Sequence, residues 1–234
     1  MTVVQALWVE GPLSDLERLS LRSFVANGHE VHLFSYGEPA GVPPGVRILP
    51  AAEVLPPSAI FRYREGGSVA GFSNLFRYKL LHDRGGWWCD TDVVCLRPLP
   101  VPEDWVFASE RKRRGGTTLA TAVVWAPAGS ELMAACLSAA ANHPDRDARW
   151  GITGPALLGA AVEQHGLAAH IRPPEVFCPI DWFAAEDLFR ATELPAEALT
   201  VHLWNEIWNR NGWQREARYA PEALYQRLHR RYPA

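Results

Sequence analysis

Short apolar runs and helical patterns alternate along the first part of the chain. Residues 3–9 form an apolar run that ends at a Gly-Pro pair, which predicts a buried strand. Ser14 and Glu17 then have the spacing of a capping box, and apolar residues follow at helical spacing as far as Gly28. Residues 31–36 alternate with period two, which predicts a second strand. A strand, a helix and a strand in this order predict the opening of an α/β fold.

The same two patterns continue to the end of the chain. We expect further strands at 46–49, 87–89, 93–96, 106–108 and 120–125, and further helices at 72–84, 129–142, 154–165 and 221–231. A chain of 234 residues, nearly half of them apolar, can bury one full-sized core but not two of ordinary size. The sequence therefore predicts a single α/β domain.

Composition narrows the classes of function. A formal net charge of −3 provides no global positive field for nucleic acid. The four cysteines form no C-x-x-C pair, so we expect buried thiols in a reducing compartment rather than a zinc site. The basic run 111–114 fits either a solvated loop or a loop that contacts anions. No secretory signal or transmembrane run is visible, which predicts a cytoplasmic protein, with peripheral contact at the inner membrane face left open.

The strongest chemical signal is an Asp-x-Asp motif. Asp90 and Asp92 follow the apolar strand 87–89, so their carboxylates should emerge at its C-terminal end, where α/β sheets bind ligands. Two hard oxygen donors suit Mg²⁺ or Mn²⁺, which can bridge a diphosphate. Continued alternation would place both carboxylates on one side and Thr91 on the other. A second such motif, at 145–147, lies in a polar stretch, and we assign it no role.

The helix that precedes this strand carries two polar residues on one face. Asn74 and Arg77 are three positions apart. The planar guanidinium of Arg77 can bind a phosphate or a sugar hydroxyl, and the Asn74 amide can both donate and accept. A surface polar pair is the alternative, but the helix is apolar almost all round, which favours a binding role.

A longer pattern connects the helix and the strand. Asn74, two apolar residues, Arg77-Tyr78, a Gly-Gly pair, aromatic residues and Asp90-Thr91-Asp92 follow one another in order. This block resembles the sugar-binding region of retaining GT-A glycosyltransferases. It is most similar to family 32, with its α1,4-galactosyltransferases and initiating α1,6-mannosyltransferases, and more distantly to the large glucosylating toxins. The resemblance extends to residues 6–9, 153–155, 177–180 and 201–205.

The resemblance implies a fold, a reaction and a set of residues. It implies a GT-A-like domain, with a Rossmann-like nucleotide-sugar-binding half at about 1–100, an acceptor-facing half at about 101–234, and a mixed sheet with flanking helices. It also implies metal-dependent transfer, with retention, of a hexose from a nucleotide-sugar, by analogy a UDP-hexose, to a glycan, glycolipid or other hydroxyl acceptor. Polysaccharide biosynthesis would be the matching process.

The resemblance assigns roles residue by residue. The catalytic residues are Asp90, Asp92 and Arg77. The donor-binding residues are Leu7, Trp8, Asn74, Arg77, Tyr78, Asp90, Thr91, Gly154 and Asn205. The ligands for Mn²⁺ or Mg²⁺ are Asp90, Asp92 and His202, although a histidine beside apolar residues is also typical of a core.

Several points stay open at the level of sequence. The family usually has Asp where this chain has Asn74, so the identity of the donor sugar does not carry over. No nucleophile is placed by a motif, which favours a front-face substitution in which the leaving phosphate takes the acceptor's proton. Four tryptophans of the C-terminal third fit either a core or an acceptor cleft: Trp182, Trp204, Trp208 and Trp213.

Two other functions compete with a transferase. A phosphohydrolase of the haloacid dehalogenase type would use Asp90 as a nucleophile and Asp92 as a general acid. It also needs a later lysine and a paired acidic motif, and Lys112 is the only lysine after Asp92. The second competitor is a catalytically inactive protein that binds a nucleotide-sugar or glycan, which the Asn74 substitution keeps open.

Overall fold

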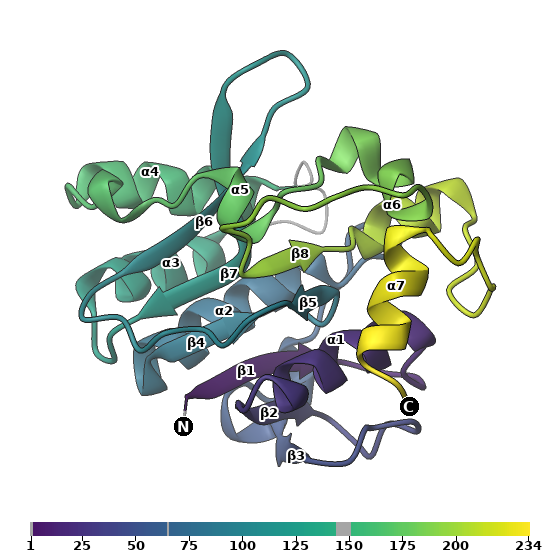
Figure 1. The fold of residues 1–234 in the computed structure, drawn as a ribbon. Helices are drawn as coiled ribbons and strands as arrows, with labels where there is room; N and C mark the ends of the chain where they lie inside the picture. The colour runs from purple at the N-terminus through teal and green to yellow at the C-terminus, as the bar shows by residue number, and fades with distance from the viewer. Residues whose placement is uncertain (1, 65, 144–150) are drawn as a thin grey trace.

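Six strands form one sheet at the centre of the molecule, in the order β3-β2-β1-β4-β7-β6. The computed structural model describes residues 2–64, 66–143 and 151–234 (Figure 1). The six strands are β1 (Val3–Trp8), β2 (Glu30–Ser35), β3 (Val46–Pro50), β4 (Gly86–Cys89), β6 (Val106–Arg111) and β7 (Thr117–Ala126). Strands β3, β2, β1 and β4 are parallel, whereas β7 runs antiparallel to both β4 and β6. The predicted mixed α/β fold class is confirmed.

The central strand β4 is buried on both faces of this sheet. Trp87 and Cys89 pack into the core on one face, and Trp88 packs into the core on the other. All three side chains are almost completely buried. Because successive side chains of a strand point to opposite faces, a run that is apolar throughout is typical of a strand covered on both sides.

Helices cover each face of the sheet. Phe24 of α1 (Asp15–Ala26) lies in the core that includes Trp87, and Phe76 of α2 (Ala70–Arg84) lies in the core that includes Trp88. Helices α3 (Glu131–Asn142) and α4 (Leu157–Gln164) lie on the same face as α2, and α7 (Leu224–Arg231) packs beside α1 (Figure 1). The remaining helical segments are η1 (Ala51–Glu53), η2 (Pro57–Ala59), η3 (Ile152–Ala156), η4 (Ala168–His170), α5 (Pro174–Phe177), η5 (Trp182–Phe189) and α6 (Asn205–Asn211).

A second, two-stranded sheet lies beside the central one. It pairs β5 (Val93–Cys95) with β8 (Thr200–His202) in antiparallel register. The predicted strand at 93–96 therefore exists, but it leaves the central sheet. This small sheet is what brings the C-terminal third of the chain next to the end of β4.

One predicted helix is interrupted near its start. In place of a helix over 154–165, the chain forms a π-helical segment, Ile152–Ala156, and α4 begins at Leu157. Gly154 has φ −105° and ψ −112°, which is not helical. A Cβ added to Gly154 would lie 2.8 Å from Nδ2 of Asn74, so the chain passes too close to α2 for a side chain there.

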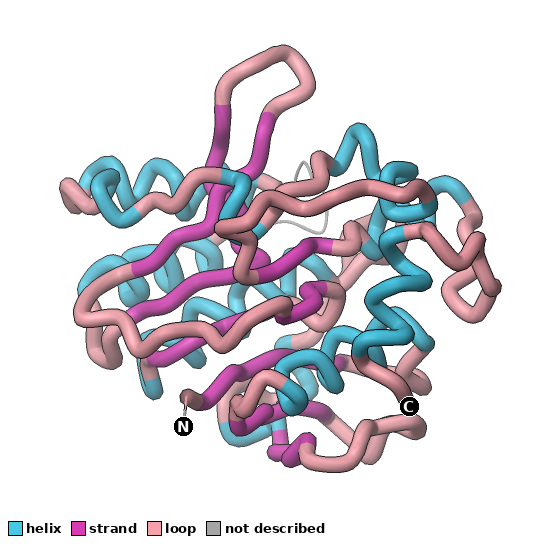
Figure 2. Tube along the Cα trace, in the orientation of Figure 1, coloured by secondary structure: helices cyan, strands magenta, loops and turns pink. Residues whose placement is uncertain are grey.

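The structure also shows where the predicted capping box and the basic run lie. The capping box of Ser14 and Glu17 is confirmed at the start of α1. The basic run forms the turn of the β6–β7 hairpin, which projects beyond the sheet (Figure 2). Its Arg111 pairs with Glu175 and Asp181, whereas the other residues of the turn are exposed. The second Asp-x-Asp motif lies outside the described residues.

The cysteines and the helices can be compared with the predictions of buried thiols and of a chain without a transmembrane run. Cys89, Cys95, Cys136 and Cys178 are all buried and free, as expected. Among the helices of the described ranges, none is both long enough and apolar enough to cross a bilayer.

Candidate active site

Asp90, Thr91 and Asp92 form the turn that connects β4 of the central sheet to β5 of the small sheet. The Asp90 amide donates to the Ala122 carbonyl of β7 at 2.8 Å, and the Val93 amide donates to the Asp90 carbonyl at 3.2 Å. The predicted extended alternation through these residues is wrong. The two carboxylates approach the same site because the chain turns there, and not because a strand continues.

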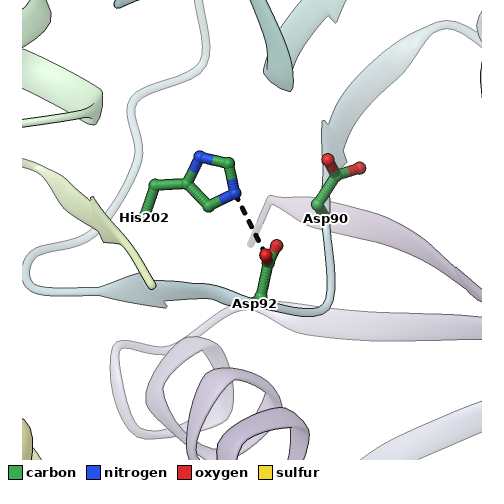
Figure 3. A group of neighbouring side chains, drawn as sticks. All are labelled: Asp90, Asp92 and His202. Carbon is green, nitrogen blue, oxygen red and sulfur yellow. Dashed lines mark hydrogen bonds and ion pairs between the residues drawn. The ribbon is translucent and has the colours of Figure 1, made fainter. Parts of the chain in front are cut away.

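Three side chains at this turn can hold a metal ion. Asp90, Asp92 and His202 each offer one ligand atom within 4.8 Å of the others (Figure 3). His202 is the register partner of Val93, so the pairing of β5 with β8 places it beside Asp92. Its Nε2 lies 3.1 Å from Oδ2 of Asp92, and the Asn205 amide donates to the same oxygen at 2.9 Å. Two carboxylates and one imidazole are a donor set that fits a divalent cation.

Asp92 and His202 stabilise each other's charged forms. Burial lowers the pKa of His202, but the charge of Asp92 and the hydrogen bond to Asp92 outweigh burial and hold the pKa well above its usual value. Burial raises the pKa of Asp92, yet the charge and hydrogen bond of His202, with the Asn205 amide, hold it below its usual value. A cation bound at these two residues would compete with the proton of the His202 imidazole.

Asp90 is bound by Arg77 of α2, the helix in which the sequence predicts a polar binding face. Arg77 Nη2 donates to Oδ1 of Asp90 at 2.6 Å, and the Trp88 indole donates to the same oxygen at 2.7 Å. The Arg77 guanidinium lies 4.7 Å from the centre of the Trp88 ring, and its Nη1 donates to the Asn74 side chain. Asn74 and Arg77 therefore share a face, as predicted, and both are buried. The pair connects α2 to the Asp-x-Asp turn.

The segment around Gly154 is hydrogen-bonded to Asn74 and Tyr78 of α2. The Asn74 amide donates to Oγ1 of Thr153 at 3.3 Å, and the Tyr78 hydroxyl donates to the Thr153 carbonyl at 3.0 Å. Tyr78 is fully buried, and burial raises its pKa far above the usual range. Tyr78 and Gly154 thus position Asn74 and its neighbours, and a direct contact of either with a donor stays a prediction.

Two cavities meet at the Asp-x-Asp turn. The first, of 410 Å³, extends over α2, β7 and α6, and we call it the sugar cavity after the ligand that we propose for it below. It is lined by Asn74, Arg77, Asp90, Asp92, Glu110, Ala120, Thr121, Ala122, Pro155, Trp182, His202, Trp204, Glu206 and Ile207, among others. The second, of 580 Å³, extends over the ends of β1 and α1, and we call it the nucleotide groove, again after the ligand proposed below. It is lined by Leu7, Trp8, Ser14, Glu17, Thr91, Asn205, Asn209, Arg215 and Glu216, among others. Asp90 and Asp92 line both.

Trp204 lines the sugar cavity and directly precedes Asn205, which lines the nucleotide groove. It has φ 59° and ψ 53°, and it is the one non-glycine residue of the described ranges with a positive φ. Such a conformation is costly for a bulky residue and is typical of functional sites. Its ring centroid lies 3.8 Å from that of His202, and its indole donates to the Ile180 carbonyl at 2.9 Å. The turn that follows aims the Asn205 amide at Asp92.

The four tryptophans lie in two different places, and a contact of any of them with an acceptor stays a prediction. Trp208 is fully buried and packs with Trp213 in the C-terminal core. Trp182 and Trp204 line the sugar cavity.

Two polar residues that line the cavities are not identified by any pattern in the sequence. Glu110 lines the sugar cavity, but in the sequence it precedes a basic run, and nothing marks it as inward-facing. Arg215 lines the nucleotide groove, where it donates to the Asn205 side chain from Nε at 2.9 Å and also to Asn209. It belongs to no motif, and only the position of α6 beside the Asp-x-Asp turn makes it visible.

Comparisons with known proteins bear on the fold and on the class of protein. Residues 126–232 match the family model described as the alpha 1,4-glycosyltransferase conserved region, a segment that includes His202 and Asn205 but not Asp90 or Asp92. No curated protein sequence matches the chain significantly. The solved structure of PaToxG glycosyltransferase is similar over 72% of this chain and 71% of that chain, with a TM-score of 0.50 and 14% identity.

Weaker similarities are to transferases. A mutant transferase structure has a TM-score of 0.45 and 13% identity over 71% of this chain and 86% of that one. A further transferase structure has a TM-score of 0.42 and 11% identity over 73% of this chain and 86% of that one. These two scores are too low to define a fold. The conserved-region match and the PaToxG similarity together support a glycosyltransferase with a GT-A-like fold.

Proposed function

We propose that the chain is a metal-dependent retaining glycosyltransferase that transfers a hexose from a UDP-hexose to a hydroxyl group of a glycan or glycolipid, in polysaccharide biosynthesis. The observation that carries the proposal is the convergence of Asp90, Asp92 and His202 within 4.8 Å. Both carboxylates also lie where the two cavities meet. A donor that spans both cavities would place its diphosphate at these three residues.

The nucleotide groove fits the nucleotide part of such a donor. Leu7 and Trp8 line the groove and can pack against the base. The Asn205 amide binds Asp92 and Arg215 binds the Asn205 side chain, so both residues lie where they can bind the diphosphate. A divalent ion held by Asp90, Asp92 and His202 would neutralise the charge that develops on the departing diphosphate. Both cavities draw residues from before and after residue 100, so the proposed donor and acceptor halves cooperate at each.

The sugar cavity fits a hexose. Among its lining residues, Asn74 and Arg77 supply hydroxyl-binding groups, and Trp182 and Trp204 supply aromatic surface. Resemblance to retaining enzymes supports attack by the acceptor on the face from which the diphosphate leaves. Proton NMR of the first product checks this, because a retained anomeric configuration is expected and an inverted one contradicts it.

The phosphohydrolase alternative fits the site less well. Its lysine would have to be Lys112, which is exposed in the turn of the projecting β6–β7 hairpin. Asp90, its nucleophile, is instead bound by Arg77 and the Trp88 indole.

Donor hydrolysis tests the proposal. The protein is incubated with a panel of UDP- and GDP-sugars, with Mn²⁺ or with a chelator, beside Asp92→Asn. We expect metal-dependent release of nucleotide from one donor, reduced at least about 100-fold in the variant because a metal ligand is lost. Asp83→Asn is the matched control, since Asp83 pairs with Lys79 on the surface of α2 and lines neither cavity.

Three outcomes separate the functions. Release of inorganic phosphate from small phosphoesters would instead indicate the phosphohydrolase. Metal-dependent UDP binding without turnover, with or without glycan acceptors, would indicate the inactive binding protein. Neither hydrolysis nor metal-dependent nucleotide binding would contradict the proposal altogether.

A further inference from the structure

Four carboxylates line the sugar cavity, and three of them have partners there. Asp90 and Asp92 are bound as described above, and Glu206 accepts from Nε of Arg210 at 3.0 Å. Glu110 differs from them. In the part of the chain that the structure describes, its side chain has no hydrogen bond and no ion pair. A carboxylate left without a partner in a cavity beside the reaction centre is available for a substrate.

The β6–β7 hairpin aims Glu110 into this cavity. On one side of Glu110 in β6, Ser109 donates to the Arg172 carbonyl at 2.7 Å, and on the other side Arg111 binds Asp181 at 3.0 Å. Side chains alternate along a strand, so these neighbours face one way and Glu110 faces the other. Arg111, the nearest cation along the strand, is already neutralised by Asp181 and Glu175.

The surroundings of Glu110 make its carboxylate a stronger base. Burial raises its pKa to about 7, the charge of His202 opposes this, and the charge of Asp181 adds to it. Trp182 and Trp204 line the same cavity, and apolar surroundings of this kind disfavour the charged form of a carboxylate. A carboxylate with a raised pKa takes a proton from a hydroxyl group more readily than an exposed one does.

We propose that Glu110 is the catalytic base that activates the acceptor hydroxyl, an inference that rests on the proposed function. The acceptor oxygen bonds to the anomeric carbon of the donor sugar while the bond from that carbon to the phosphate oxygen breaks. The electron pair of the broken bond leaves with the nucleotide diphosphate. The hydroxyl proton passes to a carboxylate oxygen of Glu110. In this proposal Glu110 takes the acceptor's proton, in place of the leaving phosphate that the family resemblance favours.

Donor hydrolysis tests this role before any acceptor is known, because water serves as the acceptor. With Mn²⁺ and the donor that the wild type hydrolyses, we expect Glu110→Gln to lower kcat about 100-fold. Donor KM and the Kd for UDP with Mn²⁺ should stay within about threefold, since Glu110 lies outside the nucleotide groove. Glu175→Gln, which removes a carboxylate bound to Arg111 of the same strand, should leave kcat unchanged.

Chemical rescue provides a readout that a structural role would not move. Glu110→Ala leaves space for a small carboxylate, so added formate should restore hydrolysis at least about tenfold in this variant and not in Asp92→Asn. A kcat for Glu110→Gln within about threefold of wild type would overturn the proposal. A loss of UDP binding parallel to the loss of kcat would also overturn it. Wild-type protein that neither hydrolyses a donor nor binds UDP with Mn²⁺ would instead show that the proposed function itself has failed.

Discussion

The two cavities that meet at Asp90 and Asp92 have walls of different chemistry. Trp182, Trp204 and Ile207, with alanines of β7, make the sugar cavity largely apolar. The nucleotide groove is instead lined by many charged and polar side chains: Glu10, Ser14, Glu17, Arg62, Asn205, Asn209, Arg215 and Glu216. Charge in an apolar enclosure is stable only when it is paired, whereas a polar groove leaves charge free to meet a ligand. We therefore expect the removal of a charged side chain to change stability in the sugar cavity and ligand binding in the nucleotide groove.

The largest effect should come from breaking the paired charges of the sugar cavity. Arg77 is 2% exposed and holds Asp90, so Arg77→Met leaves that carboxylate without its cation. We expect a loss of about 3–5 kcal/mol in the free energy of unfolding, measured by urea denaturation in the presence of EDTA. Arg84→Met is the control on the same helix, because its exposed pair with Glu53 spans 3.6 Å. That control should cost less than about 1 kcal/mol, and equal losses would remove the distinction.

The unpaired charge of the same cavity should act in the opposite direction. Burial raises the pKa of Glu110 from its ordinary value of 4.5, expected in the unfolded chain, to about 7 in the folded chain. The folded state holds the extra proton between these values, so wild-type stability falls as pH rises through this window. Glu110→Gln, which cannot ionise, should be more stable than wild type by about 3 kcal/mol at pH 8 and equal to it at pH 4.5, without metal.

Urea denaturation at several pH values measures this difference. Glu175→Gln is again the control, since the pKa of Glu175 is lowered by its own backbone amide and by Arg111, and its removal should give no gain at pH 8. A Glu110→Gln variant that is no more stable than wild type at pH 8 would contradict the cost of an unpaired charge in the sugar cavity.

The smallest effect belongs to the nucleotide groove. Arg215 is bound by amide oxygens of Asn205 and Asn209, and in the described ranges it has no ion pair. Arg215→Gln should weaken UDP binding about tenfold and leave uridine binding unchanged, because the guanidinium charge is bound only by neutral amide oxygens in the described ranges and can still pair with the diphosphate. Calorimetric titration with both ligands measures this. Arg218 is exposed and lines neither cavity, so Arg218→Gln should change the affinity for neither UDP nor uridine. A weaker affinity of Arg215→Gln for uridine would instead place Arg215 at the base.

Much of the fold could be predicted from local pattern. The strand at Val3–Trp8, the capping box before α1 and the helix that ends at Arg84 all match their expected places within a residue or two. Each is determined by neighbours within about one turn of helix or a few residues of strand. The predicted start of α4 at residue 154 is wrong. The backbone at Gly154 passes close to Asn74 of α2, which lies far away in the sequence.

The candidate site divides in the same way. Asn74, Arg77, Asp90 and Asp92 lie within one continuous block, so a motif of ordinary length contains them. His202 could be named only through the family resemblance, because it is 110 residues from Asp92 and reaches it through the pairing of β5 with β8. Glu110 and Arg215 belong to no motif and are recognised only by the cavities that they line.

The sequence by itself determined the α/β class, the helix that carries Arg77 and the Asp-x-Asp turn, since all of these follow from periodicity and short-range spacing. The tertiary structure alone decided that the chain leaves the central sheet after Asp90, that a distant strand brings His202 to Asp92, and that Glu110 faces the sugar cavity without a partner. These depend on which distant segments pair and pack, and a one-dimensional pattern does not encode that pairing. Long-range contacts form where the combined gain in burial and hydrogen bonding outweighs the entropy lost on closing the chain between them.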